Sequence, residues 1–402
     1  MKQEQLANLS IEWKRGSGLS KSDLDEAGKN KCILYGELYT KHKKVLIESS
    51  NISRTNKIGK VCSKKGDILI PGTSTASKKD MLLAREINED GVFLGGDINI
   101  IRPPKGLFAK KYLPYYFETF TAYDQLDKYI TGATGIIHIS NSGIKNLQIR
   151  LPSLSEQQHI VAILDEAFAA IAKAKANAEQ NLNNAKEFFE SYLQGMFESG
   201  NWEVKKLNEI TEVKDGTHDS PKYIKEGIPF VTQKNIRQGG LSFADTRFIT
   251  ETDHEKFYKR SNVTYGDILI SMIGANRGMA AIVDDKRIFS IKNVGLIKES
   301  KNINKHFLLY YLKSSLAMKY VLYMSNGGAQ EFIGLTALRS FPIPYPTIKE
   351  QEAIVKKLDA LSAETKKLEA IYQQKINDLE ELKKSVLQKA FSGELKTVKE
   401  VV

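Results

Sequence analysis

Side chains that can form paired hydrogen bonds with nucleotide bases gather in short polar stretches of this sequence. Gln, Asn and Arg can make two hydrogen bonds to one base edge, whereas Lys, Ser and Thr suit phosphate oxygens. For any single residue, an ordinary solvated turn is the alternative interpretation. The candidate DNA-binding residues are Tyr35, Lys41, Lys43, Thr73, Ser74, Thr75, Ser77, Lys78, Lys79, Thr217, His218, Ser220, Gln233, Lys234, Asn235, Arg237, Ser271, Asn276, Arg277, Asn326 and Gln330.

Motifs for bond chemistry are missing from the sequence. It contains no Gly-rich loop for S-adenosylmethionine, no Asn/Asp-Pro-Pro-aromatic motif and no P-loop, and Pro103-Pro104 lies in a basic context. Asp285 with Glu299 and Lys301 resembles the acidic-x-Lys pattern of nuclease metal sites, but such tripeptides are common by chance. His218 has no second metal ligand nearby in sequence. We therefore predict no catalytic residues, no metal site and no cofactor bound by this chain.

The composition is that of a globular protein with more than one domain. The chain has 402 residues, of which 41% are hydrophobic and 27% charged. Its first residues contain no apolar signal region, and no apolar run approaches the roughly 20 residues that span a bilayer. Cys32 and Cys62 are the only cysteines, which argues against a disulfide framework or a zinc site. We expect a cytoplasmic protein that is not in a membrane.

Positive charge is concentrated in two separate blocks of the chain. Residues 1–148 have 23 basic and 16 acidic side chains, a net +7, and residues 201–342 have 21 and 15, a net +6. The segments between and after them, 149–200 and 343–402, have net charges of −3 and +1. Two basic blocks suit two surfaces that each approach a polyanion, although a generally basic protein would give the same total.

The chain is built from an internal duplication. Residues 149–197 align with residues 343–391 without a gap, and 18 of the 49 positions are identical. The pentapeptide Gly-Asp-Ile-Leu-Ile also occurs twice, at residues 66–70 and 266–270. Between these anchors the two globular blocks diverge, so the sequence predicts a repeated scaffold with different contents.

Both copies of the aligned segment predict a long helix. Ser153 and Glu156, like Thr347 and Glu350, have the spacing of a capping box, and no proline or glycine follows until Gly195 and Gly393. Apolar residues recur at heptad spacing, which favours an antiparallel coiled coil within the chain. Packing of each helix on its own block, or pairing with a second copy, are the alternatives. The residues expected at the pairing seam are Leu164, Ile171, Ala178, Phe188, Leu358, Leu368, Tyr372, Leu379 and Leu382.

The two blocks themselves are predicted to be mixed α and β. Runs rich in β-branched residues at 61–70, 92–101, 267–273 and 288–297 predict strands separated by Gly, Asn and Ser turns. An aromatic helix is expected after them in each block, at residues 111–117 and 306–312, with most of its rings in the core. The fold class is therefore α+β, with two globular α/β blocks joined by two long antiparallel helices and related by a pseudo-two-fold repeat.

This doubled pattern resembles the specificity subunits of type I restriction-modification systems. The resemblance rests on Leu-Pro-Ser-Leu-Ser-Glu-Gln at 151–157, Tyr-Pro-Thr-Ile-Lys-Glu-Gln at 345–351, Asp-Gly-Thr-His at 215–218, Gly-Ile-Pro-Phe at 227–230 and Tyr-Gly-Glu-Leu-Tyr-Thr at 35–40. It covers nearly the whole chain. One departure is that residues 201–205 have no good counterpart before Leu6, so the N-terminus looks abbreviated and the first strand of the first block is in doubt.

The resemblance implies a division of labour between domains. Residues 1–148 and 201–342 would be target recognition domains that each read one half of a two-part site in double-stranded DNA. Residues 149–200 and 343–402 would be the helices that set the gap and dock methyltransferase and restriction subunits. S-adenosylmethionine, ATP and Mg are expected on those partner subunits.

Two functions of other classes compete with this interpretation. A tethering protein with a coiled-coil stalk and two heads that do not bind DNA is disfavoured by the two basic blocks. A fused nuclease or methyltransferase is disfavoured by the missing motifs. Within the interpretation as a specificity subunit, an orphan subunit that serves partners encoded at another locus is an open alternative.

Overall fold

The computed structural model describes residues 3–75, 77–133, 135–325 and 331–394. Contacts divide the chain into two compact units, 1–178 with 374–402, and 179–373. Each unit therefore holds one globular block with part of each long helix. The four-part linear division expected from the sequence stays a prediction, because this grouping follows contacts in space. The expected asparagine and glutamine contacts at 326 and 330 lie outside the described residues.

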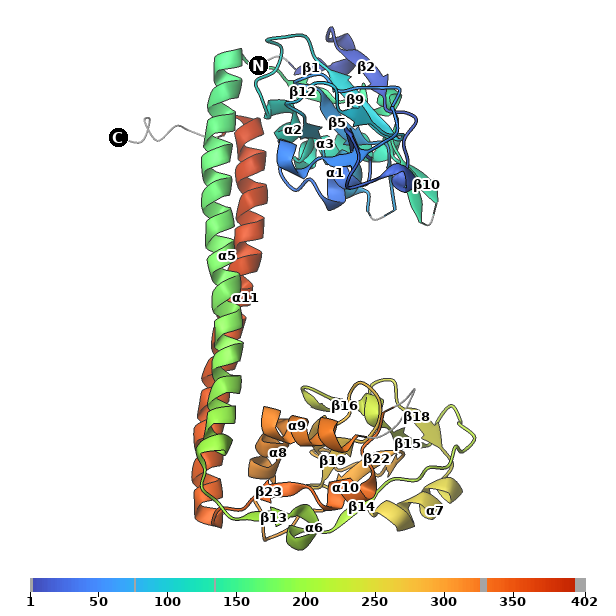
Figure 1. Cartoon of the computed structure of the whole chain (residues 1–402), viewed down its shortest axis with the longest axis vertical. Coiled ribbons are helices and arrows are strands. Elements are labelled where there is room, and N and C mark those ends of the chain that lie inside the picture. The colour runs from blue at the N-terminus through green and yellow to red at the C-terminus, as the bar shows by residue number, and fades with distance from the viewer. Residues whose placement is uncertain (1–2, 76, 134, 326–330, 395–402) are drawn as a thin grey trace, which may run out of the picture. The chain divides into compact units, whose positions relative to one another are not determined.

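The described residues of the first block form short strands around an antiparallel sheet (Figure 1). Its sheets are β2 (Glu12–Arg15), β9 (Ile98–Arg102), β5 (Ile68–Pro71) and β7 (Arg85–Glu86); β4 (Ser53–Thr55), β3 (Asn30–Ile33) and β8 (Phe93–Leu94); β10 (Thr131–Ala133), β11 (Ile136–His138) and β6 (Thr73–Ser74); and β1 (Gln3–Gln5) with β12 (Gln148–Arg150). Its helices are α1 (Glu37–Thr40), α2 (Tyr112–Phe117), α3 (Phe120–Leu126) and α4 (Asn141–Ile144), with the 3-10 turns η1 (Leu6–Asn8), η2 (Lys21–Asp23), η3 (Ser49–Asn51), η4 (Lys79–Leu82) and η5 (Asp127–Tyr129).

The second block repeats this plan with other contents. Its sheets are β14 (Val213–Asp215), β22 (Val294–Ile297), β19 (Ile268–Ser271) and β20 (Ala280–Ile282); β18 (Arg247–Ile249), β15 (Ile228–Val231) and β21 (Ser290–Ile291); β16 (Ile236–Arg237) with β17 (Gly240–Leu241); and β13 (Val204–Lys206) with β23 (Pro342–Pro344). Its helices are α6 (Leu207–Ile210), α7 (Glu251–Ser261), α8 (Lys305–Lys313), α9 (Ser315–Met324) and α10 (Leu335–Arg339), with the 3-10 turn η6 (Gln233–Asn235).

Strand register shows that the two blocks are structural repeats. The repeated pentapeptide forms the central strands β5 and β19, with Ile68 opposite Ile101 and Ile268 opposite Ile297. In the first block, β3 pairs with β4 in antiparallel and with β8 in parallel orientation. In the second block, β15 pairs in the same way with β18 and β21. The observed strands are shorter than the apolar runs that predicted them. The duplication is therefore confirmed in three dimensions.

Strand β1 corrects one expectation about the first block. Gln3–Gln5 pairs with β12 as β13 pairs with β23 in the second block. The sequence before Leu6 does not resemble residues 201–205. A strand that pairs through backbone groups does not require such resemblance, because its side chains contribute no ladder hydrogen bonds.

The long helices begin where the capping boxes predict. Helix α5 spans Leu154–Ser199 and α11 spans Ile348–Ser392. The Glu350 carboxylate accepts hydrogen bonds from the Thr347 amide, at 2.8 Å, and from its hydroxyl, at 2.7 Å. In the first copy, the Glu156 amide donates to the Ser153 hydroxyl at 3.2 Å. These bonds satisfy backbone donors that have no partner inside the helix.

The next residue of each repeat anchors its long helix to its block. The buried Gln157 amide oxygen accepts from the Ala109 amide at 2.8 Å, and its nitrogen donates to the carbonyls of Pro152 and Leu107 at 3.0 and 3.2 Å. The buried Gln351 accepts in the same way from the Asn304 amide at 2.7 Å and donates to the Pro346 carbonyl at 2.9 Å. The repeated Glu-Gln pair therefore caps the helix and ties it to the adjoining block.

The aromatic helices α2 and α8 pack against the same helical segments. The Tyr115 hydroxyl donates to Asp165 at 2.6 Å, and the Tyr310 hydroxyl donates to Asp359 at 2.7 Å. Burial and these carboxylates raise the pKa of both tyrosines. Phe117 and other rings of the two helices lie in the cores of their blocks, as expected from the sequence.

Within each unit the two long helices pack against each other. In the first unit, Val161 and Leu164 share a core with Leu387 and Ala390. Lys383 lies over the Phe168 ring, 5.1 Å from its centroid, and Lys175 forms an ion pair with Glu380 at 2.6 Å. Residue numbers rise along α5 as they fall along α11, so the helices are antiparallel. In the second unit, residues 193 and 197 of α5 share a core with residues 354 and 358 of α11.

The residues expected at the helix seam differ in burial. Leu164, Ile171, Ala178 and Leu358 are buried, and Tyr372 and Leu379 are half-buried, whereas Phe188, Leu368 and Leu382 are exposed. A strict heptad drifts about 20° per repeat relative to a straight helix, so the inward positions move along the chain. On α5 the neighbouring Phe189 and Leu193 take the inner positions in place of the expected 188.

Candidate nucleic-acid interface

The candidate loops of the second block are carried on the ends of its strands. Residues 216–220 follow β14, the turn η6 follows β15, and residues 272–278 follow β19. The sheets beneath them are held by backbone ladders and a buried apolar core. Loops on a rigid scaffold can present polar side chains to a ligand in a fixed arrangement.

A cavity of about 410 Å³ lies among these elements. Three predicted residues, Gln233, Lys234 and Asn235, line it, and its lining includes three cationic side chains and one carboxylate. Its lining residues are Tyr223, Phe230, Thr232, Gln233, Lys234, Asn235, Asp245, Arg247, Ile273, Lys292 and Asn293. The cavity therefore combines positive charge, amide and hydroxyl groups, and aromatic rings, which is the chemistry that contacts to nucleic acid require.

The Asn235 side chain stabilises the turn and is not presented at its surface. It is buried, its amide oxygen accepts from the Thr232 amide at 2.9 Å, and its amide nitrogen donates to the Ser242 carbonyl at 3.0 Å. These bonds fix the η6 turn, which places Gln233 and Lys234. Its predicted contact with DNA stays a prediction.

A network of polar contacts holds the loop after β14. Asp215 is buried and accepts hydrogen bonds from Arg260, the shortest at 2.7 Å. The exposed His218 ring lies between Asp215 at 3.1 Å and the Asn293 amide oxygen at 2.7 Å. Thr217 is buried, and Ser220 accepts from Lys292. The network fixes the position of His218 beside the cavity.

The remaining predicted residues of the second block differ in their freedom to contact a ligand. Ser271 is buried in β19 and Asn276 is exposed. Arg277 is half-buried, donates to the Gly274 carbonyl at 3.2 Å and forms an ion pair with Glu331. Arg237 lies 3.6 Å from Asp245. Arg277 is thus held within its own loop.

In the first block, three predicted residues lie on the loop after β3. Tyr35 is half-buried and tilted against the Tyr39 ring, 6.5 Å between centroids. Lys41 donates to the Ser53 hydroxyl at 2.7 Å, and the exposed Lys43 donates to the Tyr39 carbonyl at 3.1 Å. Lys43 therefore offers the more accessible charge of the two lysines.

The other predicted residues of the first block follow β5. Thr73 and Ser74 are buried in β6, whereas Thr75, Ser77, Lys78 and Lys79 are exposed. Lys78 forms an ion pair with Asp127 at 2.8 Å, and that hydrogen bond raises the pKa of the lysine and lowers the pKa of the carboxyl group. The strand before these residues, β6, pairs with β11 in the short sheet β10-β11-β6.

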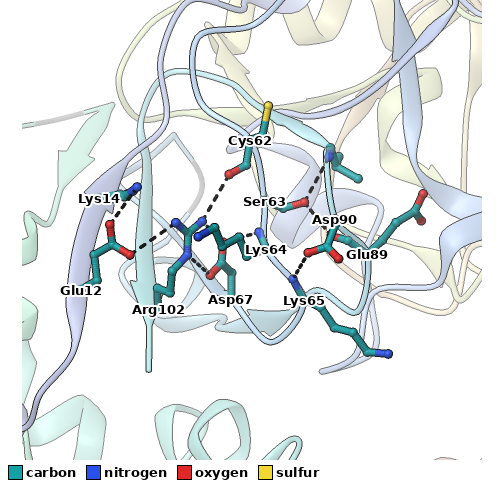
Figure 2. Close-up of polar contacts among 11 residues, drawn as sticks. Glu12, Lys14, Cys62, Ser63, Lys64, Lys65, Asp67, Glu89, Asp90 and Arg102 are labelled. Carbon is teal, nitrogen blue, oxygen red and sulfur yellow. Dashed lines mark hydrogen bonds and ion pairs between the residues drawn. The ribbon is translucent and has the colours of Figure 1, made fainter. Parts of the chain in front are cut away.

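The aspartate of the repeated pentapeptide is a structural group. Figure 2 shows Arg102 between Glu12 and the buried Asp67. Two nitrogens of Arg102 each donate to Asp67 at 2.7 Å, and Asp67 also accepts from the Lys64 amide at 2.8 Å. In the second block, Asp267 accepts in the same way from the Thr264 amide and from Lys298. The contact ties the start of one central strand to the end of its neighbour.

The acidic residues that resembled a nuclease pattern form ion pairs with basic neighbours. Asp285 forms an ion pair with Arg287 at 2.8 Å, and Glu299 pairs with Lys305 at 2.7 Å. Among the described residues, no group of three His, Cys, Asp or Glu side chains is placed to hold a metal ion.

Several residues of the cavity were not among the predicted contacts, including Tyr223, Arg247, Lys292 and Asn293. They come from the loop before β15, from β18 and from the end of β21, which are far apart in sequence. Alternation of polar and apolar residues along β18 indicates an exposed side chain at 247, but no local signal places it beside Gln233.

Comparison with known proteins identifies the family. The model of the type I restriction modification DNA specificity domain matches residues 1–182 and again 199–381. The chain belongs to this family. Membership assigns DNA sequence specificity to the chain, with one matching domain in each half of the duplication.

Individual specificity subunits resemble the chain over most of its length. The type I restriction enzyme MjaVIII specificity subunit of Methanocaldococcus jannaschii is 25% identical over 303 residues, 70% of each chain. The type I restriction enzyme EcoBI specificity subunit of Escherichia coli is 26% identical over 294 residues, 66% of this chain and 62% of the relative.

Solved structures share the fold of this specificity-domain chain. A chain from a study of complex assembly and conformational transition of the type I R-M system superposes with a TM-score of 0.73 at 16% identity, covering 95% of this chain and 97% of that one. The HsdS subunit from Thermoanaerobacter tengcongensis gives 0.59 at 16% identity, covering 96% and 97%. Across the described part of the chain, no helix combines the length and apolarity needed to cross a membrane.

Proposed function

We propose that the chain recognises a two-part DNA target and carries out no bond chemistry itself. Each block contacts one half-site, and the paired helices set the distance between the half-sites. Partner methyltransferase and restriction subunits dock on the chain and supply S-adenosylmethionine, ATP and Mg. The matching domain in each half of the sequence supports two reading modules in place of one.

The observation that carries this proposal is that the two blocks repeat the same sheet but differ in the loops that follow its strands. The central strands of the two blocks keep the same register, while the residues after them differ in charge, size and hydrogen-bonding groups. Such a design allows two different base sequences to be read by one architecture, because base edges are distinguished by side-chain donors and acceptors.

A methylation map tests the two-part target. Adenine methylation would be mapped in the genome of a cell that carries this chain with its partner subunits. We expect one motif with two specified parts and an unspecified gap. A continuous motif, or methylation without sequence preference, would contradict the proposal.

The helices provide a separate test of spacing. Removing one heptad from each long helix shortens both by about 10.5 Å, which corresponds to at most about three base pairs. We expect a shorter gap with both specified parts unchanged. Removing a heptad from α11 alone is the control, since it breaks the pairing register and should abolish methylation. An unchanged gap after the double deletion would refute the role of the helices.

Direct binding distinguishes the proposal from a tethering protein. The purified chain with its modification subunits would be titrated with duplex DNA across a salt series. A DNA reader loses affinity steeply as salt rises, because bound cations release counterions from the phosphates. A tethering protein would bind no duplex at any salt concentration.

A further inference from the structure

Arg247 occupies an unusual position in the cavity of the second block. It lies in β18 opposite Phe230, and its guanidinium carbon is 4.6 Å from the centroid of the Tyr223 ring. Among the residues that the structure describes, no carboxylate or hydrogen-bond acceptor is paired with this guanidinium. An arginine stacked on an aromatic ring keeps its N–H groups in a fixed plane and free to donate at its edge.

Other arginines of the second block are held by its own groups. Arg260 is bound to Asp215, Arg277 to Glu331 and Arg287 to Asp285. Those bonds satisfy guanidinium donors inside the protein. Arg247 therefore differs from them, because the Tyr223 ring holds its guanidinium and no carboxylate among the described residues accepts its N–H groups.

The groups around Arg247 suit a stretch of duplex. Gln233 and Lys234 are on η6 in the same cavity, and Lys292 follows β21. The Gln233 amide has no side-chain partner among the described residues, so it can bond to a second base. The two lysines add charge for phosphates, and the cavity's Asp245 is already paired with Arg237.

Corresponding positions in the first block are filled differently. By strand register, Arg247 corresponds to Ser53, which accepts a hydrogen bond from Lys41. Lys292 corresponds to Gly95, and a Cβ built at Gly95 would lie 2.5 Å from Leu34. A leucine thus fills in the first block the space that is open in the second, so this arrangement is a property of the second block.

We propose that Arg247 reads a guanine in the half-site recognised by the second block, and that Tyr223 positions it. Two guanidinium N–H groups donate to the O6 and N7 acceptors of the base, the contact that arginine geometry favours in the major groove. This inference rests on the proposed function of the second block as a DNA reader.

The test separates base reading from charge. Methylated adenines would be mapped for the wild type and for Arg247→Lys, each with the partner subunits. Lysine keeps the charge but loses the rigid fork, so one guanine of the second half-site should lose about 10- to 100-fold in discrimination. The first half-site and the gap should be unchanged. Arg287→Lys is the matched control, because Arg287 also stacks on an aromatic ring, Phe243, but does not line the cavity.

Tyr223→Leu tests the positioning role. Loss of the ring leaves Arg247 in place but unsupported, so the same guanine should lose part of its discrimination. A merely structural role for Tyr223 would instead lower methylation of all sites equally. That result would overturn the positioning role.

Three outcomes contradict the assignment of Arg247. The first is a wild-type second half-site that contains no G·C pair, and the second is an unchanged motif for Arg247→Lys. The third is an Arg247→Ala variant that loses affinity equally for all sequences and has a weaker salt dependence, as loss of a phosphate contact gives. Failure of the proposed function is distinguishable, because the wild type would then show no two-part motif.

Discussion

Replacing Gln157 by leucine tests whether the repeated Glu-Gln pair anchors the long helix. Gln157 is buried at the start of α5 and bonds to three backbone groups, the Ala109 amide and the carbonyls of Leu107 and Pro152. Leucine keeps a similar size and helix propensity but provides none of these bonds. The change therefore isolates the hydrogen bonds of the side chain.

The expected cost follows from the groups that lose their partners. The buried Ala109 amide is left without an acceptor, which costs about 1–3 kcal/mol. Leu107 and Pro152 are half-buried, so their carbonyls can bond to water in the variant. Loss of the two hydrogen bonds from Gln157 to these carbonyls therefore adds about 0.5–1 kcal/mol in total. We expect the free energy of unfolding of the first unit to fall by about 1.5–4 kcal/mol.

Urea unfolding of the first unit measures this effect. Of the two tryptophans in the chain, Trp13 belongs to the first unit and Trp202 to the second. In a Trp202→Phe background, fluorescence therefore reports the first unit alone. Gln158→Leu is the control, because Gln158 is adjacent and exposed, and should change stability by at most about 0.5 kcal/mol. Equal stability of the two leucine variants would refute the anchor.

Two further substitutions can be measured with the same fluorescence assay. Arg102→Met leaves the buried Asp67 carboxylate without its ion-pair partner and should destabilise the first unit by about 3–5 kcal/mol. Glu12→Gln, at an exposed partner of Arg102, should have little effect, so similar urea midpoints for the two variants would contradict this reasoning. Burial lowers the pKa of His42 from 6.5 to about 4, so its contribution to stability is complete above pH 6.5 and is lost as pH falls through about 4. That contribution is about 3 kcal/mol, and His42→Leu should reduce the loss of urea resistance over this range; an unchanged acid dependence would contradict it.

The large features of the fold could be predicted because they rest on local or repeated signals. The capping residues Ser153 and Thr347 mark helix starts within one residue of those observed. The repeated pentapeptide marks the central strand of each block, and each block's aromatic helix forms near the predicted range. In each case a short stretch of sequence determines the element, so no distant contact is needed to recognise it.

The candidate site could be predicted only in part because its residues meet through tertiary contacts. Gln233 and Lys234 were expected from their polar loop, but Arg247 and Lys292 reach the same cavity from other strands. Asn235 has the same residue type and loop as a base contact, yet its amide replaces backbone partners within the turn. Side-chain type alone does not separate these two uses of asparagine.

The repeat also explains how two blocks of one fold can carry different contents. The Lys292 amide donates to the Val231 carbonyl at 2.9 Å, and the Gly95 amide donates to the Ile33 carbonyl at the same distance. This hydrogen bond is the same in both blocks although one residue is a lysine and the other has no side chain. Because the backbone carries the sheet, side chains at its edge can change without loss of the ladder. Substitutions at such positions can therefore alter what a block reads while its fold is retained.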